Sequence, residues 1–166
     1  MKTLIVVRHA KSSWDDREIP DIDRPLNGRG KRDAPRMAKR LKEKEVTIDI
    51  VVTSPAVRTV ATCDIFVDTL SLPKKSVELV RELYHAGDEV ILGVIRRFND
   101  KNGVAMLFGH NPGLTDFVNN LLEEEIDNIP TTGIVCCRLM IEKWSDAIWG
   151  CGKMEFFDYP KKGSEG

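Results

Sequence analysis

The segment LIVVRH, residues 4–9, passes from four apolar residues directly into an arginine and a histidine. A short apolar run that is rich in β-branched residues and has a polar boundary is typical of a buried β-strand. Because Arg8 interrupts the run, it is too short for the apolar core of a signal peptide. We therefore expect a central strand over residues 4–7, with Arg8 and His9 emerging at its carboxyl end.

Two more apolar runs of the same kind follow later in the chain. Residues 50–52 lead into Thr53-Ser54-Pro55, and residues 104–108 lead into Gly109-His110-Asn111. Apolar residues also recur at the spacing of one helix face in four segments: 34–41, 57–65, 90–98 and 114–122. The alternation of strands and helices predicts an α/β fold in which the three strands are central and parallel.

The boundaries of several elements can also be predicted. Ser54-Pro55 and Asn111-Pro112 each put a capping residue before a proline, which predicts that a helix begins at each proline. A short strand is expected at 77–80. The last third has shorter apolar runs, which predict strands at an antiparallel edge of the sheet: 134–141, 147–149 and 154–157. We find no repeat and no long linker, and predict a single domain over residues 1–159 and a flexible tail over residues 160–166.

The composition restricts the partners that we expect. Of the 166 residues, 42% are hydrophobic and 31% are charged, which is ordinary for a soluble globular protein. The 25 basic and 26 acidic side chains nearly cancel, which argues against nucleic-acid binding. The four cysteines form no CxxC pair and the three histidines show no ligand spacing, so we expect no disulfides, no metal and no cofactor. We expect a cytoplasmic protein without a membrane partner, whose oligomeric state the sequence leaves open.

The polar residues after the strands form a candidate site. In an open parallel sheet, ligands bind beyond the carboxyl ends of the strands, where Arg8, His9 and His110 are expected. Arg58 falls in the first turn of a predicted helix, and helical side chains lean toward the helix N-terminus. Arg58 should therefore point back over the strand ends. Because the planar fork of arginine grips two phosphoryl oxygens at once, two arginines and two histidines indicate a phosphate pocket.

His9 can act as a nucleophile in such a pocket. The ordinary histidine pKa of about 6.5 leaves much of the ring neutral at cellular pH, and nearby arginines favour the neutral form further. A lone histidine after a strand is more often structural. The neighbouring Arg8, together with the other pocket residues, favours the catalytic interpretation.

Four motifs identify a family resemblance: RHAKSSW at 8–14, DRPLNGRG at 23–30, SPAVRTVAT at 54–62 and GHNPGL at 109–114. With these motifs, in this order, the chain resembles the histidine phosphatase superfamily, also called phosphoglycerate mutase-like. Ala10 and the Glu82-Leu83-Tyr84 segment look closest to the SixA-type phosphohistidine phosphatases. The resemblance implies a three-layer α/β/α architecture with a mostly parallel central sheet.

The resemblance also implies roles for individual residues. His9 is expected to become phosphorylated, while Arg8, Arg58 and His110 bind the phosphoryl group and stabilise the transition state. Ser12 is expected to help bind the phosphate. Glu82 is the best match to the carboxylic acid that protonates the leaving oxygen in many members of the superfamily.

Three functions remain open at this point. The first is metal-independent hydrolysis of phosphohistidine on a protein. The second is hydrolysis of a small phosphomonoester, such as a phosphorylated metabolite, which needs Glu82 as proton donor. The third is a phosphate-binding module without catalytic activity, which is the weakest hypothesis because the nucleophile is present.

Several other residues receive a structural or peripheral interpretation. His85 is expected at the surface or the pocket rim, outside the catalytic set. Asp21-Ile22-Asp23 has the form of a DxD motif, but no apolar strand precedes it and prolines flank it, so we expect a loop. Cys136 and Cys137 are expected in a buried strand. The candidates for residues that line the entrance and select the substrate are Lys11, Trp14, Arg24 and Arg29.

Overall fold

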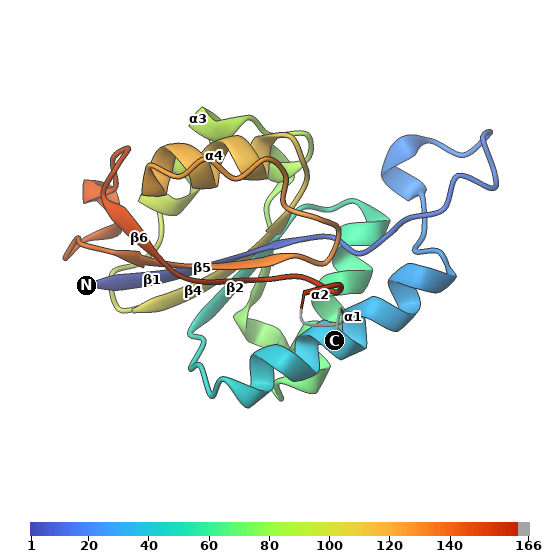
Figure 1. Cartoon of the computed structure of the whole chain (residues 1–166), viewed down its shortest axis with the longest axis horizontal. Helices are drawn as coiled ribbons and strands as arrows, with labels where there is room; N and C mark the ends of the chain where they lie inside the picture. Colours follow the sequence, from blue (N-terminus) through green and yellow to red (C-terminus); the bar gives the residue numbers. More distant parts are fainter. Residues whose placement is uncertain (163–166) are drawn as a thin grey trace.

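A six-stranded sheet forms the centre of the fold in the computed structural model, which describes residues 1–162 (Figure 1). The strands are β1 (Lys2–Arg8), β2 (Ile50–Thr53), β3 (Val77–Leu79), β4 (Val104–Gly109), β5 (Ile134–Leu139) and β6 (Gly152–Asp158). The helices are α1 (Gly28–Glu43), α2 (Val57–Thr69), α3 (Asp88–Arg96) and α4 (Gly113–Leu122). Four short 3₁₀ helices are η1 (Asp21–Asp23), η2 (Lys74–Ser76), η3 (Arg81–Leu83) and η4 (Trp144–Asp146).

The strands lie in the order β3-β2-β4-β1-β5-β6. The pairs β3-β2, β2-β4 and β4-β1 are parallel, whereas β1-β5 and β5-β6 are antiparallel. Helices α1 and α2 pack together on one face of the sheet, and α3 and α4 cover the other face (Figure 1). The predicted three-layer α/β fold, with a mostly parallel sheet and an antiparallel C-terminal edge, is confirmed.

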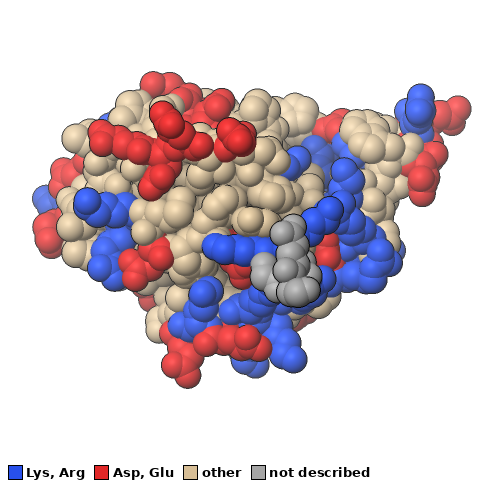
Figure 2. Space-filling view, viewed as in Figure 1, with Lys and Arg blue, Asp and Glu red and all other residues tan. Residues whose placement is uncertain are grey.

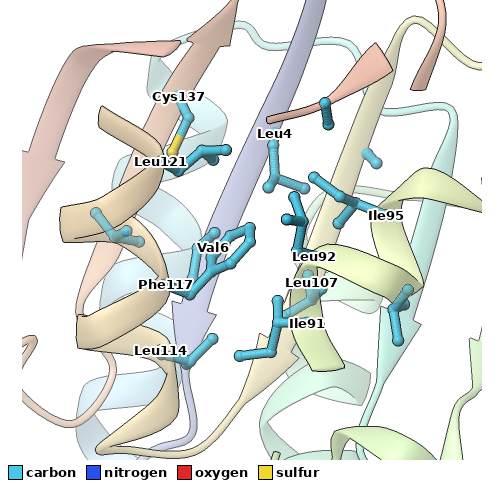
Figure 3. Close-up of a cluster of buried hydrophobic side chains, with 14 of the residues drawn as sticks. Leu4, Val6, Ile91, Leu92, Ile95, Leu107, Leu114, Phe117, Leu121 and Cys137 are labelled. Carbon is cyan, nitrogen blue, oxygen red and sulfur yellow. The ribbon is translucent and has the colours of Figure 1, made fainter. Parts of the chain in front are cut away.

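Strand β1 is buried on both faces, which explains why its sequence is apolar without alternation. Leu4 and Val6 pack toward α3 and α4, where Leu92 and Phe117 point at them (Figure 3). Ile5 and Val7 belong to the cluster on the other face, which includes Met37 of α1 and Phe66 of α2. The two layers of helices therefore hold the end of β1, and the residues that follow it, in a fixed position.

Two predicted helix starts are wrong, one by two residues and the other by one residue. Helix α2 begins at Val57 rather than at Pro55, and α4 begins at Gly113 after Pro112. The Oδ1 atom of Asn111 still accepts a hydrogen bond from the backbone N–H of Thr115 (3.2 Å), as a capping residue does. The hydroxyl of Ser54 instead has the buried His110 as its closest side-chain partner (2.7 Å). Ser54 therefore contacts the site and does not cap α2.

Two other predictions of local structure are wrong, and a third can be compared with the structure only in part. Residues 147–149 do not form a strand; they lie between η4 and β6 and lead into a turn. The buried Trp144 of η4 holds this segment in place with a hydrogen bond from its indole N–H to the Asn102 carbonyl (2.7 Å). Residues 21–23 form the 3₁₀ helix η1 rather than an irregular loop. Arg36 binds the carbonyl of Pro160 (2.8 Å), which ties the start of the predicted tail to α1, while residues 163–166 lie outside the described part. The division at residue 159 stays a prediction.

Candidate active site

Three adjacent strands end at the candidate site. Strand β4 lies between β1 and β2, although β2 comes before it in the sequence, because α1 carries the chain from β1 past the position of β4. Arg8 pairs with Gly109 and Thr53 pairs with Phe108, so the three strands end at the same level. The residues that follow them, His9, Ser54 and His110, therefore meet at one edge, as the rule for open parallel sheets predicts.

The ring of His9 is held in one orientation. Its Nδ1 atom lies 2.7 Å from the carbonyl oxygen of Ala10. A carbonyl oxygen only accepts, so Nδ1 carries the proton and Nε2 keeps its lone pair. The backbone N–H of Ala10 in turn donates to Thr62 Oγ1 (2.9 Å), which fixes this turn of the chain against α2. The lone pair of His9 Nε2 is thus available for attack.

The environment of His9 keeps the ring neutral. Burial of the ring lowers the pKa of His9 to about 4, the hydrogen bond to Ala10 opposes this, and the positive charges of Arg58 and Arg8 lower the pKa further. At pH 7 the ring is therefore neutral, which is the form that a nucleophile requires.

His110 lies beside His9, with ring centroids 5.2 Å apart. Its Nε2 atom is 2.7 Å from Ser54 Oγ and 3.4 Å from Thr59 Oγ1, while its Nδ1 atom is 3.5 Å from Arg58 Nη2. Burial, followed by the proximity of His9 and Arg58, lowers the pKa of His110 to about 3. Both histidines are thus neutral at pH 7, and the arginines supply the positive charge of the site.

Arg58 is the second residue of α2, and its side chain leans back over the strand ends. It is 4% exposed, and its Nε atom lies 3.4 Å from His9 Nε2. Its backbone carbonyl accepts a hydrogen bond from Thr62 Oγ1 (2.8 Å), the same hydroxyl that binds Ala10. A single threonine therefore connects the turn that carries His9 to the turn that carries Arg58.

The side chain of Arg8 has a hydrogen bond at one nitrogen and an unpaired atom at another. Its Nη1 atom donates to the Ile129 carbonyl (2.8 Å), and within residues 1–162 its buried Nε atom has no hydrogen-bond partner. Thr132, whose backbone N–H binds the carbonyls of Arg8 and His9, has a buried hydroxyl that likewise lacks a partner in this part of the chain. Buried polar atoms are rarely unpaired, so such atoms call for an explanation.

Two of the expected site residues have side-chain partners other than the two histidines and Arg58. Glu82 is exposed on η3 and forms an ion pair with Arg97, the residue that follows α3 (2.7 Å). Ser12 is buried, but its hydroxyl accepts a hydrogen bond from Arg24 Nη2 (2.5 Å). The structure thus brings together Arg8, His9, Arg58 and His110, whereas the side-chain partners of Ser12 and Glu82 are Arg24 and Arg97.

The sequence interpretation did not identify several residues of the site. Ser54, Thr59 and Thr62 lie with Arg58 in the SPAVRTVAT motif, so this motif contained the signal for all four residues. Asp21 on η1 binds Arg58 twice, through its backbone carbonyl to Nη1 (2.7 Å) and through Oδ2 to Nη2 (3.1 Å). A residue expected in an ordinary loop is therefore the main anionic partner of Arg58.

The rim of the site includes two of the proposed entrance residues. The guanidinium of Arg24 lies 3.2 Å from the ring centroid of the exposed Trp14, and a hollow of about 320 Å³ lies beside this pair. Lys11 and Arg29 are exposed, and Arg29 pairs with Asp33 (3.4 Å). On the other side, His85 and Pro112 line a hollow of about 380 Å³. His85 is thus a rim residue.

Two general features of the described chain bear on the expected partners. Within residues 1–162, no three histidine, cysteine or acidic side chains are clustered so that they could hold a metal ion. In the same range, no helix combines the length and the apolar character needed to cross a membrane. Cys136 and Cys137 are buried in β5, where burial raises the pKa of Cys136 to about 11.

Comparison with known proteins agrees with this geometry. The sequence model of the histidine phosphatase superfamily (branch 1) matches residues 4–89, slightly more than half of the chain. An uncharacterised protein of Mycobacterium tuberculosis is 28% identical over 165 residues, covering 93% of this chain and 100% of the relative. Phosphohistidine phosphatase SixA of Escherichia coli (strain K12) is 29% identical over 134 residues, covering 80% of this chain and 81% of the relative.

A solved structure of the protein histidine phosphatase SixA complexed with tungstate has a TM-score of 0.80 and is 26% identical, covering 95% of this chain and 97% of that chain. The matching family model, the similar structure and the phosphoglycerate mutase-like sheet all point to one family. The chain belongs to the histidine phosphatase superfamily.

Proposed function

We propose that the protein is a phosphatase that uses His9 as nucleophile and removes the phosphoryl group from phosphohistidine on a protein. The observation that carries this proposal is the position of the neutral His9 Nε2 atom, 3.4 Å from the buried Arg58 guanidinium. A nucleophile with a free lone pair, next to fixed positive charge, is what phosphoryl transfer requires.

In the first step, the Nε2 lone pair of His9 attacks phosphorus, and the bond from phosphorus to the imidazole of the substrate breaks. Arg8, Arg58 and His110 bind the equatorial oxygens in a loose transition state. A phosphoryl oxygen would give the unpaired Arg8 Nε atom an acceptor. In the second step, water attacks the phosphohistidine, which releases inorganic phosphate and restores His9.

Ser54 allows His110 to change its role when substrate binds. A hydroxyl both donates and accepts, so Ser54 Oγ can accept from His110 Nε2–H or donate to the bare Nε2 atom. In the second case the proton of His110 is on Nδ1, which faces Arg58. His110 can then donate to a phosphoryl oxygen without acquiring a net charge.

The positions of the carboxylates favour phosphohistidine over a phosphate ester as substrate. An alkoxide leaving group needs a proton donor, whereas an imidazole that is protonated on its ring leaves without one. Glu82, the expected donor, is paired with Arg97 on the surface. The name of the SixA relative gives the same substrate class for that protein.

The charge distribution favours an anionic protein substrate. Helix α1 contains seven lysines and arginines but only two acidic residues, and Figure 2 shows lysine and arginine side chains gathered over it. The helix begins beside the site, since the backbone N–H of Asn27 donates to the Lys11 carbonyl (3.0 Å). This surface can attract a phosphorylated partner toward the pocket. Metal-independent activity and a cytoplasmic location remain predictions.

The test compares the parent protein with His9→Ala and Cys63→Ser, in chelator, on an aryl phosphate and on a protein that carries phosphohistidine. We expect phosphate release from both substrates, faster from phosphohistidine, and acid-labile labelling of the protein by radioactive phosphate. His9→Ala should lose release and labelling, while Cys63→Ser, which replaces a different buried nucleophile, should keep both. No release from the parent protein would refute the proposal.

A further inference from the structure

Asp21 is the centre of a network of hydrogen bonds at the site. Its Oδ2 atom accepts from Arg58 Nη2 (3.1 Å) and from the Tyr84 hydroxyl (2.6 Å), and lies 3.2 Å from His85 Nε2. Its Oδ1 atom accepts from Arg24 Nη1 (2.9 Å). Residues from the β1–α1 connection, from α2 and from the segment around η3 therefore meet at one carboxylate.

The two edges of the Arg58 guanidinium have different partners. The end edge, formed by Nη1 and Nη2, is bound by Asp21 through its backbone oxygen and Oδ2. The side edge, formed by Nε and Nη2, faces His9 Nε2 at 3.4 Å and His110 Nδ1 at 3.5 Å. Because the guanidinium is planar and its donors have fixed directions, a partner on the end edge fixes the direction of the side edge.

We infer that Asp21 is a positioning residue of the phosphatase: it holds the end edge of Arg58 so that the side edge is presented to the phosphoryl group at His9. This inference rests on the proposed function and adds a residue to it. Asp21 acts through Arg58 and does not touch the reacting atoms.

The remaining contacts of Asp21 show why it can hold Arg58 in place. Arg24 is 6% exposed and also donates from Nε to the Ser13 carbonyl (3.0 Å), so it connects η1 to the segment after β1. Tyr84 approaches from the other side of the site, with its ring 5.6 Å from that of His110. Although burial opposes it, hydrogen bonds from Tyr84, Arg24 and Arg58 lower the pKa of Asp21 well below its usual range. The carboxylate is thus ionised whenever the enzyme works.

A competing explanation is that Asp21 occupies the place of the phosphoryl group and inhibits the enzyme. The two explanations differ in the edge of Arg58 that the carboxylate uses. An inhibitor would bind the side edge, which faces both histidines, whereas Asp21 binds the end edge. Positioning therefore predicts that loss of the carboxylate lowers activity, and inhibition predicts that it raises activity.

The first experiment compares Asp21→Asn with Asp23→Asn, which removes an exposed carboxylate from the same 3₁₀ helix. We expect Asp21→Asn to lower kcat/KM for an aryl phosphate by about tenfold to a hundredfold, since displacement of a binding group by about 1 Å has effects of that size. Tungstate binding, measured by calorimetry, should weaken in parallel. Asp23→Asn should stay within about twofold of the parent on both measurements.

The second experiment distinguishes positioning from a general structural role. In an Arg58→Lys background, Asp21→Asn should change kcat/KM by less than about twofold, because the planar edge that Asp21 holds is then absent. Tyr84→Phe, which removes one donor to Asp21 and leaves Arg58 intact, should cause a smaller loss that disappears in the Arg58→Lys background. This second pair does not contain Asp21→Asn and keeps the test valid should that variant fold poorly.

A rise in kcat/KM for Asp21→Asn would overturn the inference in favour of inhibition. An equal loss with and without Arg58 would overturn it in favour of a structural role. Absence of activity in the parent protein would refute the proposed function instead, and the tungstate measurement would then still report whether Asp21 acts through Arg58.

Discussion

Replacing His9 with asparagine should reduce the sensitivity of the folded protein to mild acid. The folded state holds His9 with a pKa of about 4, whereas the ring in the unfolded chain has the ordinary value of about 6.5. Between these values the unfolded chain binds a proton that the folded protein does not. The contribution to stability is therefore fully present above pH 6.5 and is lost as the pH falls toward 4.

The expected magnitude follows from this difference. At pH 5 the unfolded ring is almost fully protonated and the folded ring is mostly neutral, which destabilises the folded state by about 2 kcal/mol relative to pH 7. The burial of His9, which is only 8% exposed, is the main cause of the shift, so solvent screening does not reduce the effect greatly. His9→Asn removes the titrating ring and with it this part of the pH dependence.

Urea unfolding at pH 7 and pH 5, followed by circular dichroism, measures the effect. The free energy of unfolding of the parent should fall by about 2 kcal/mol more between these pH values than that of His9→Asn. Leu121→Ala serves as the control, because it removes a buried core side chain that does not titrate and should lower stability equally at both pH values. Equal losses in the parent and in His9→Asn would show that the ring is not held neutral.

Three further predictions follow from the structure. Gly30→Ala should cost about 1–3 kcal/mol of stability and reduce turnover, because its Cβ would lie 2.2 Å from the Lys11 carbonyl oxygen. Gly28→Ala is the control, because its Cβ meets only the flexible end of Arg32. Equal shifts in melting temperature for the two variants would contradict the prediction. Glu82→Gln should keep kcat/KM for phosphohistidine within about threefold of the parent, since Glu82 pairs with Arg97. A fall in kcat/KM by about two orders of magnitude would instead identify Glu82 as the proton donor. Dialysis against a chelator should leave the rate unchanged, because the arginines supply the positive charge, and restoration of a lost rate by one divalent metal would refute this.

The sequence allowed the fold class to be predicted, and also the convergence of most residues of the candidate site, because both depend on local patterns. The run of residues 4–7 is apolar throughout, as a strand buried on both faces must be. The orientation of Arg58 follows from its place in the first turn of a helix. The order of the strands did not follow from the sequence, yet this order puts His110 between Ser54 and His9.

Contacts between distant segments account for what the sequence did not reveal. Asp21 lies in a stretch without apolar periodicity, and its partners Arg58 and Tyr84 are 37 and 63 residues away. Ser54 shows a related problem, since a serine before a proline is a capping signal, but here the hydroxyl binds His110. Glu82 matched a family position in sequence, while an ion pair with Arg97 directs it to the surface.

Burying Arg58 creates a requirement that Asp21 meets. A buried guanidinium needs an anionic partner, because an unpaired buried charge strongly destabilises a fold. A phosphoryl group provides that partner only while substrate is bound, so a permanent carboxylate must stabilise the arginine at other times. Asp21 does so from the end edge of Arg58, while Nε on the side edge faces His9. The same ion pair can therefore stabilise the free protein and leave available the edge that we propose binds phosphate; in the proposed function, the folding of the β1–α1 connection is thus linked to catalysis.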